Sequence, residues 1–199
     1  MEFVGATALA FGAVFVAEFG DKSQLLILAF ATRYSWRPVV IGLVMAATVI
    51  QGISVAIGTA VGTALPATVV AIISGTAFLA VAVWTLRGED DEEDEEVPDS
   101  VSHRRVAGIG LVLTVAGAFI LGELGDKTML ATFALAATQG AVPTWIGSTA
   151  GEVAANLVAV VVGRQVGHRL SPRLVRIGSA ALFAFAGLVI LAGVLATQG

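Results

Sequence analysis

Long apolar stretches alternate with short polar segments along the whole chain. Six such stretches are visible, at approximately 3–32, 38–63, 66–86, 106–138, 144–166 and 174–197. A helix needs about 20 apolar residues to cross the hydrocarbon core of a bilayer, and every stretch reaches that length. The pattern therefore predicts an all-α integral membrane protein with six transmembrane helices.

The composition excludes most soluble folds. Hydrophobic residues make up 57% of the 199 residues, only 13% are charged, and the mean hydropathy is +0.91. Soluble domains carry about 25% charged residues, and so short a chain could not bury this much apolar surface in water. The chain has no cysteine, which excludes disulfides, thiolate metal sites and a cysteine nucleophile.

The second half of the chain repeats the first. A shift of 105 residues aligns 12–62 with 117–167 without a gap, with 16 identities in 51 positions. Each half holds three apolar stretches, so the second copy must enter the membrane from the opposite side. The sequence thus predicts two inverted three-helix repeats. We place the first at 1–86, an acidic cytoplasmic linker at 87–105, and the second at 106–199.

The positive charges indicate how the chain lies in the membrane. All nine arginines fall on one side of the predicted topology, at Arg33, Arg37, Arg87, Arg104, Arg105, Arg164, Arg169, Arg173 and Arg176. Arginine-rich loops face the cytoplasm by the positive-inside rule. We therefore expect the acidic linker in the cytoplasm and both termini outside.

Apart from the arginines, seven charged residues lie inside the apolar stretches. They are Glu18, Asp21, Lys22, Glu123, Asp126, Lys127 and Glu152. A charge at the centre of a membrane helix costs about 2.5–3.5 kcal/mol on insertion scales, so these residues are candidates for a functional site. The first six form two copies of one pattern at i, i+3 and i+4, which predicts that each copy shares one helix face.

Oxygen ligands accompany these charges, which predicts a site for a hard divalent cation. The predicted metal ligands are Glu18, Asp21, Glu123, Asp126, Ser23 and Thr128. The predicted supporting residues are Lys22, Lys127, Gln24, Gln51, Glu152 and Asn156. Carboxylate, hydroxyl and amide oxygens suit Ca²⁺, Mg²⁺ or Mn²⁺. Four motif carboxylates and two lysines leave a charge of −2, which one such ion would neutralise.

Two features break or extend the repeat. Glu152 aligns with Ala47, so it adds an acid in one half only, either available for proton exchange or forming a structural hydrogen bond to a neighbouring helix. Asn156 aligns with Gln51. The small-residue pair Gly58 and Gly62 is typical of a helix packing face.

Other interpretations stay open at this point. Each Glu–Lys pair could neutralise itself as a structural ion pair. An exporter of an amino acid or another small organic solute could hold an ammonium group with the carboxylates and a carboxylate with lysine. An intramembrane hydrolase is disfavoured, because the chain has no Ser/His pair, HExxH or GxGD motif. We expect no enzyme activity and no catalytic residue.

At the charged motifs the sequence resembles a known family. Residues 18–23 (EFGDKS) and 123–128 (ELGDKT) match the E-φ-G-D-K-[ST] signature of the UPF0016 family, also called the Gdt1-type or TMEM-type manganese/calcium transporter family. The resemblance covers essentially the whole chain. It implies a cation/proton antiporter that exports Mn²⁺, and in some members Ca²⁺, from the cytosol. The implied ion-binding acids are Glu18, Asp21, Glu123 and Asp126. Many members of the family have Gln directly after each motif. Gln24 fits this pattern in the first half, whereas Met129 departs from it in the second.

The resemblance completes the expected function. Transport would proceed by alternating access, with protons from outside displacing the metal because both compete for the same oxygens.

We expect no cofactor besides the transported Mn²⁺ or Ca²⁺ and the exchanged protons. The expected partners are the cation and the lipid bilayer, with no nucleic acid, and a homodimer is left open. The short length and the lack of an extended targeting segment favour a plasma membrane location.

Overall fold

The chain folds entirely into helices where its structure is described. The structure is a computed structural model that describes residues 2–18, 21–87, 108–166 and 172–198, so the predicted linker lies almost wholly outside it. The eight helices are α1 (Glu2–Glu18), α2 (Lys22–Arg33), α3 (Trp36–Ala64), α4 (Ala67–Arg87), α6 (Ile109–Glu123), α7 (Lys127–Gln139), α8 (Ala141–Val166) and α9 (Pro172–Gln198). The predicted all-α class is confirmed.

Two of the predicted helices are broken in the middle. The stretch at 3–32 forms α1 and α2, and the stretch at 106–138 forms α6 and α7, which meet at an angle of 79°. Each Glu-x-Gly-Asp-Lys motif lies across one of these breaks. The prediction that its three charges share one face of a continuous helix is therefore wrong.

The motif residues themselves explain the breaks. Asp21 and Asp126 have extended backbone and occupy the N-cap positions of α2 and α7. Aspartate is among the preferred N-cap residues, so it starts a new helix where the periodicity alone predicts continuation. Gly125 has φ +84°, a conformation that glycine adopts without the steric cost of a Cβ atom.

Large apolar side chains lie on the surface, whereas the glutamates at the helix breaks and on α8 lie inside. Large apolar side chains such as Val4 and Leu121 are more than 70% exposed, whereas Glu18 and Glu152 are fully buried. Among the described helices, α3 and α4 are each long and apolar enough to cross a membrane, and the bent pair α6 and α7 makes a third if it is one span. This distribution is the one expected where the outer surface faces lipid.

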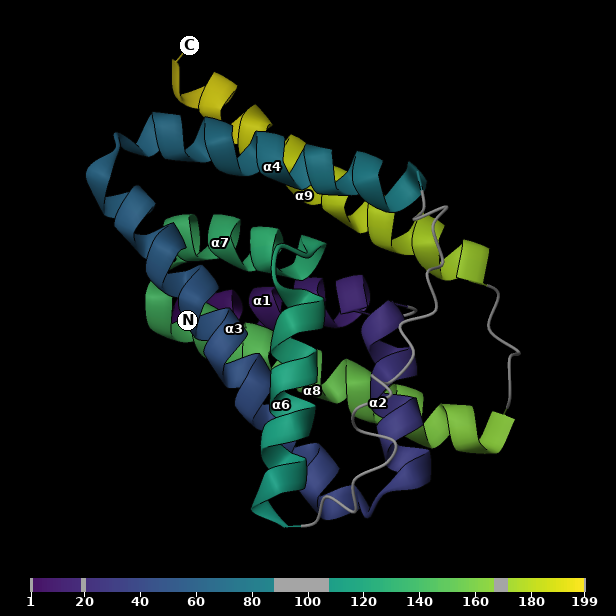
Figure 1. Ribbon diagram of the computed structural model, residues 1–199. Coiled ribbons are helices and arrows are strands. Elements are labelled where there is room, and N and C mark those ends of the chain that lie inside the picture. The colour runs from purple at the N-terminus through teal and green to yellow at the C-terminus, as the bar shows by residue number, and fades with distance from the viewer. Residues whose placement is uncertain (1, 19–20, 88–107, 167–171, 199) are drawn as a thin grey trace.

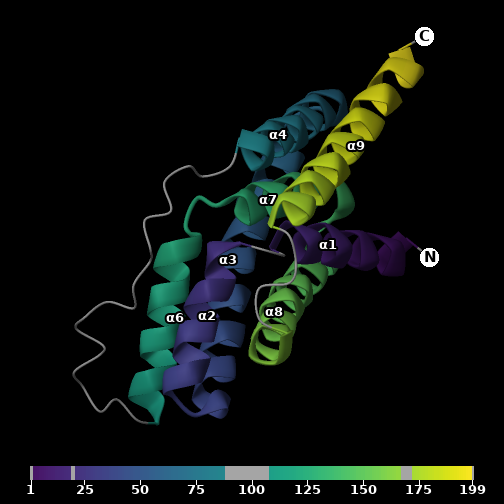
Figure 2. The same cartoon turned by 90° about the vertical axis from the view of Figure 1, so that its right-hand side faces the viewer.

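The main helix contacts join the two halves of the chain. Helix α1 packs along α8, and α6, its counterpart under the 105-residue shift, packs along α3. Helices α4 and α9 lie side by side on top of α7 in the view of Figure 1, and Figure 2 shows α1 crossing α8. At the α4–α9 contact Phe78 meets its own counterpart Phe183, with ring centroids 5.9 Å apart. The core therefore forms between the halves.

Glycines allow α3 to approach α7 closely. A Cβ atom added to Gly58 would lie 3.0 Å from the Cβ of Ala136 and closer still to the carbonyl oxygen of Phe133. One added to Gly62 would lie 2.6 Å from the carbonyl oxygen of Ala137. The predicted packing role of this glycine pair is confirmed. Helix α7, which begins in the second motif, is thereby fixed against α3.

Gly58→Ala should destabilise the protein by about 1–3 kcal/mol, because the methyl group must displace the backbone of α7. The midpoint of thermal unfolding in detergent measures this effect. Gly12→Ala is the matched control, since a Cβ atom there would meet nothing within 4 Å. Equal midpoints for the two variants would contradict the close α3–α7 contact.

Candidate metal centre

The two helix breaks share one equivalent backbone hydrogen bond. The backbone N–H of Asp21 donates to the carbonyl of Glu18 at 3.2 Å, and that of Asp126 donates to the carbonyl of Glu123 at 3.1 Å. A break exposes the end groups of two helices, which have no partner within their own helix. In apolar surroundings such irregular backbone is tolerated where it lines a site, and discontinuous helices are typical of transporter ion sites.

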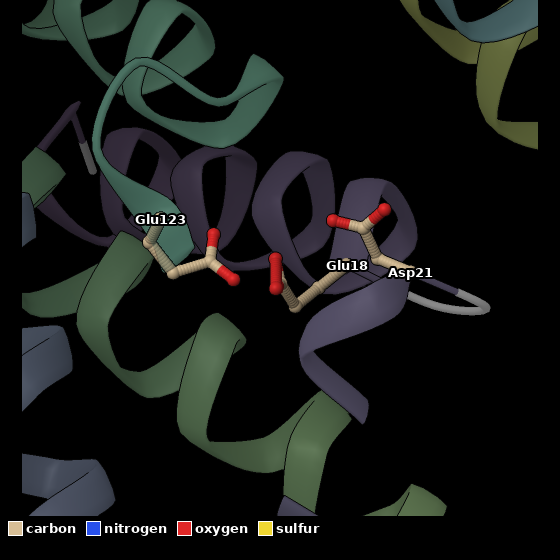
Figure 3. A group of neighbouring side chains, drawn as sticks. All are labelled: Glu18, Asp21 and Glu123. Carbon is tan, nitrogen blue, oxygen red and sulfur yellow. The ribbon is translucent and has the colours of Figure 1, made fainter. Parts of the chain in front are cut away.

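Three carboxylates gather at these breaks. Glu18 and Asp21 come from the first half and Glu123 from the second, and each offers an oxygen within 4.8 Å of the other two. Figure 3 shows the carboxylates of Glu18 and Glu123 turned toward each other, with Asp21 beside Glu18. Oxygens bound to one Ca²⁺ lie 2.3–2.6 Å from it, so they can be at most about 5 Å apart. The cluster therefore has the dimensions of a cation site.

The cluster is shielded from solvent and short of partners. Glu18 and Glu123 are 0% and 2% exposed. Within the described part of the chain, Oε2 of each glutamate and Oδ2 of Asp21 are buried without a hydrogen bond. Buried polar groups without a partner are costly and rare in folded proteins. A bound cation would satisfy all three oxygens at once.

The two predicted hydroxyl ligands lie in different surroundings. Ser23 donates a hydrogen bond of 2.7 Å to Oε1 of Glu18, so its hydroxyl fixes one carboxylate of the cluster. Thr128 is fully buried, and its hydroxyl has no partner among the described residues. The oxygen of Thr128 therefore has unused capacity to bind a ligand.

The second aspartate does not repeat the position of the first. Asp126 accepts a hydrogen bond from the backbone N–H of Thr128 at 3.5 Å and lies outside the three-carboxylate cluster. Lys127 donates to Oδ1 of Asp21 at 2.7 Å, so it pairs with the other half rather than with Glu123 of its own motif. This geometry disfavours the alternative of a self-neutralising Glu–Lys pair in the second motif. The side chain of Lys22 lies outside the described residues.

The remaining predicted residues line α3 and α8. Gln51, Glu152 and Asn156 are all fully buried, and Gln51 donates to Glu152. Gln24, at the start of α2, donates to the carbonyl of Ala155 on α8 at 3.4 Å. The supporting residues thus lie beside the first motif, but none of them belongs to the three-carboxylate cluster.

Two residues at the site were not predicted. Thr132 is fully buried on α7, and its hydroxyl has no partner among the described residues. Its spacing of four residues from Thr128 could have indicated a shared face of α7. Met129 was noted only as a departure from the family pattern. Its sulfur accepts from the backbone N–H of Gly125 at 3.2 Å and so supports the second break.

Broken apolar helices around a buried carboxylate cluster are typical of membrane ion transporters. A comparison with known protein families identifies which family of transporters this is. This chain belongs to the divalent cation/proton antiporter GDT1 family, whose model matches residues 6–93 and 111–198. The two matched segments begin 105 residues apart, which is the shift that aligns the motifs. The family resemblance of the motifs is confirmed, and the family is one of transporters.

Individual relatives agree with this assignment. The "Putative manganese exporter" of Vibrio cholerae is 31% identical over 179 residues, which cover 88% of this chain and 85% of that protein. The chloroplastic GDT1-like protein 1 of Oryza sativa is 31% identical, and protein PAM71 of Arabidopsis thaliana is 30% identical. Those matches cover 92% and 88% of this chain but only 61% and 54% of the plant proteins. No solved structure matches the chain.

Glu18→Gln should weaken binding of Mn²⁺ to the purified protein by about ten-fold or more, because it removes one charged ligand of the cluster while keeping the side-chain volume. Equilibrium dialysis measures the affinity. Glu2→Gln is the control, since Glu2 is exposed at the start of α1 and far along the helix from Glu18. Unchanged affinity in Glu18→Gln would place the metal elsewhere.

Proposed function

We propose that this protein exports a divalent cation, Mn²⁺ or Ca²⁺, from the cytosol in exchange for protons. The observation that carries the proposal is the cluster of Glu18, Asp21 and Glu123, which unites both halves of the chain at two helix breaks. Membership of a cation/proton antiporter family supports the class of transport. The name of the Vibrio cholerae relative favours Mn²⁺ as the first ion to test.

The charge of the cluster suits a dication. Three carboxylates and the ammonium group of Lys127 leave a net charge of −2. One Mn²⁺ or Ca²⁺ neutralises it, and both ions accept carboxylate and hydroxyl oxygens as ligands. Metal and protons compete for the same oxygens, so protons arriving from outside release the bound cation there.

We further propose six membrane spans in two inverted halves, at 1–86 and 106–199. The spans are α1 with α2, α3, α4, α6 with α7, α8 and α9. In this topology the acidic linker at 87–105 is cytoplasmic, both termini are outside, and the protein lies in the plasma membrane. The one-sided distribution of the arginines supports the orientation.

An unequal packing of equivalent helices supports alternating access. Helix α4 packs on α7, and Ser74 donates to the carbonyl of Ala134 at 3.3 Å. Under the 105-residue shift, the counterpart of α4 is α9 and that of α7 is α2. Ser179 therefore aligns with Ser74, and Ala29 aligns with Ala134. In the described part of the chain α9 makes no comparable contact with α2. Inverted repeats that adopt different packings can exchange them, which moves access from one side to the other.

In the proposed topology, the arginines indicate which side of the membrane the α4–α7 contact faces. Helix α2 ends at Arg33, and Arg173 and Arg176 lie in the first turns of α9. These ends are cytoplasmic in the proposed topology, so the α4–α7 contact lies toward the outside. We infer a state that is sealed toward the outside by α4 and α7, with the cytoplasmic pair α2 and α9 not yet packed together.

The organic-solute alternative receives no support from the site. Binding of an amino acid carboxylate would need a free lysine within the cluster. Lys127, the one motif lysine whose side chain the structure describes, already donates to Asp21. We therefore propose no second function.

Proteoliposomes with an imposed pH gradient should accumulate Mn²⁺ through the wild-type protein, because protons leaving by the same site drive the cation inward. Glu18→Gln should reduce the initial rate at least ten-fold, in line with its loss of a ligand. Collapse of the gradient with an ionophore is the control and should stop accumulation. Gradient-driven accumulation at the wild-type rate in Glu18→Gln would sink the proposed site.

Cysteine pairs should report the two gates, because the chain has no cysteine of its own. We expect Ser74→Cys with Ala134→Cys to cross-link rapidly in the resting protein, and Ala29→Cys with Ser179→Cys to cross-link slowly. Either cross-link should stop transport, since both gates must open in each cycle. The wild type treated with the same oxidant is the control. Normal transport by fully cross-linked Ser74→Cys/Ala134→Cys protein would rule out α4 and α7 as a gate.

A further inference from the structure

A second group of buried polar side chains lies between α3 and α8, away from both motifs in sequence. Gln51 on α3 donates from Nε2 to Oε2 of Glu152 on α8 at 2.5 Å. Asn156, one helical turn after Glu152, donates from Nδ2 to the main-chain carbonyl of Glu152 at 3.0 Å. All three residues are 0% exposed. We call these three residues the α3–α8 polar group.

Both amide nitrogens of this group donate a hydrogen bond, but three of its four side-chain oxygens accept none among the described residues. Oε1 of Gln51, Oε1 of Glu152 and Oδ1 of Asn156 are buried without a hydrogen-bond partner in the described part of the chain. Each such oxygen carries a cost when it is removed from water and left unpaired. A proton on Glu152 supplies one donor and could satisfy one further oxygen. A cation is the other kind of partner for such oxygens, because carboxylate and amide oxygens are both ligands of hard cations.

The group is distinct from the motif cluster. Glu152 is absent from the set of acids whose oxygens lie within 4.8 Å of one another. Gln24 bonds to the carbonyl of Ala155, which lies between Glu152 and Asn156, so the start of α2 connects the two groups.

The buried charge exceeds what one divalent cation can neutralise. Five described acids are mostly or fully buried, namely Glu18, Asp21, Glu123, Asp126 and Glu152. The two motif lysines, Lys22 and Lys127, offset two of these five negative charges and leave a formal charge of −3. A single Mn²⁺ or Ca²⁺ neutralises two of the three, so negative charge remains to attract a second cation.

We propose that the α3–α8 polar group is a second binding site for a divalent cation, held by Gln51, Glu152 and Asn156. An ion there occupies the crossing of the two long helices α3 and α8, one from each half of the chain. Glu152 has no acidic counterpart in the first half, because the 105-residue shift aligns it with Ala47. The site therefore has a carboxylate from one half only. The inference rests on the proposed function only for the identity of the ion.

The test is the number of Mn²⁺ ions bound per chain by the purified, full-length protein, measured by equilibrium dialysis over a range of free Mn²⁺. The wild type should bind two. Glu152→Gln and Asn156→Leu should each weaken one of the two sites at least ten-fold and leave the other unchanged. Ser54→Ala is the matched control, because Ser54 is also buried on α3 but its hydroxyl already donates to the carbonyl of Ile50.

The outcomes separate this site from the motif cluster. Loss of one ion in Glu18→Gln and of the other in Glu152→Gln establishes two sites. A single ion in the wild type that Glu152→Gln does not affect overturns the second site and leaves water as the occupant, with the proposed function intact. Should Glu152→Gln not fold, the exchange Gln51→Glu with Glu152→Gln keeps the same atoms in the group. That exchange should bind two ions, and binding of one would overturn the proposal.

Discussion

Charge inside an apolar protein interior must be matched by partners from the protein itself, and this constraint organises the centre of the molecule. Glu18 and Glu123 are almost completely buried, and bulk water cannot satisfy them. Ser23 supplies one hydrogen bond to Glu18, and Lys127 supplies an ion pair to Asp21. In the described part of the chain, several carboxylate oxygens nevertheless have no partner. Under the proposed function, a bound cation or proton supplies the missing partner, and the two compete for the same oxygens.

The pair between Lys127 and Asp21 also links the halves of the chain. Its distance of 2.7 Å joins a residue at the start of α7 to the N-cap of α2. A dication that binds beside Asp21 competes with the ammonium group for the same carboxylate. Under the proposed function, release of Lys127 would free α7 from the first motif, while the glycine contacts still hold α7 against α3. Ion binding would then be coupled to the relative position of the halves.

Equivalent residues of the two motifs do not have equivalent roles in this state. Asp21 joins the carboxylate cluster and pairs with Lys127, whereas Asp126 caps its own helix. Ser23 is bonded to Glu18, whereas the hydroxyl of Thr128 is unused. The same inequality recurs at the larger scale, where α4 packs on α7 and α9 does not pack comparably on α2 in the described residues. The asymmetry is therefore present both in the motifs and in the packing of the helices, as the proposed alternating access would need.

The sequence by itself determined the helical class, the buried acids and the register of the repeat, because each depends on residue type and spacing alone. The 105-residue shift also relates Phe78 to Phe183, but only the structure shows that these two rings meet. Periodicity could not locate the helix breaks. The charged residues of a motif have the same spacing whether its Asp caps a new helix or lies on the face of a continuous one. Nor could it pair Lys127 with Asp21 or group Glu152 with Gln51, because those partners come from different halves. Only the packing of one half against the other decides which oxygens meet, since local spacing carries no information about distance between distant segments.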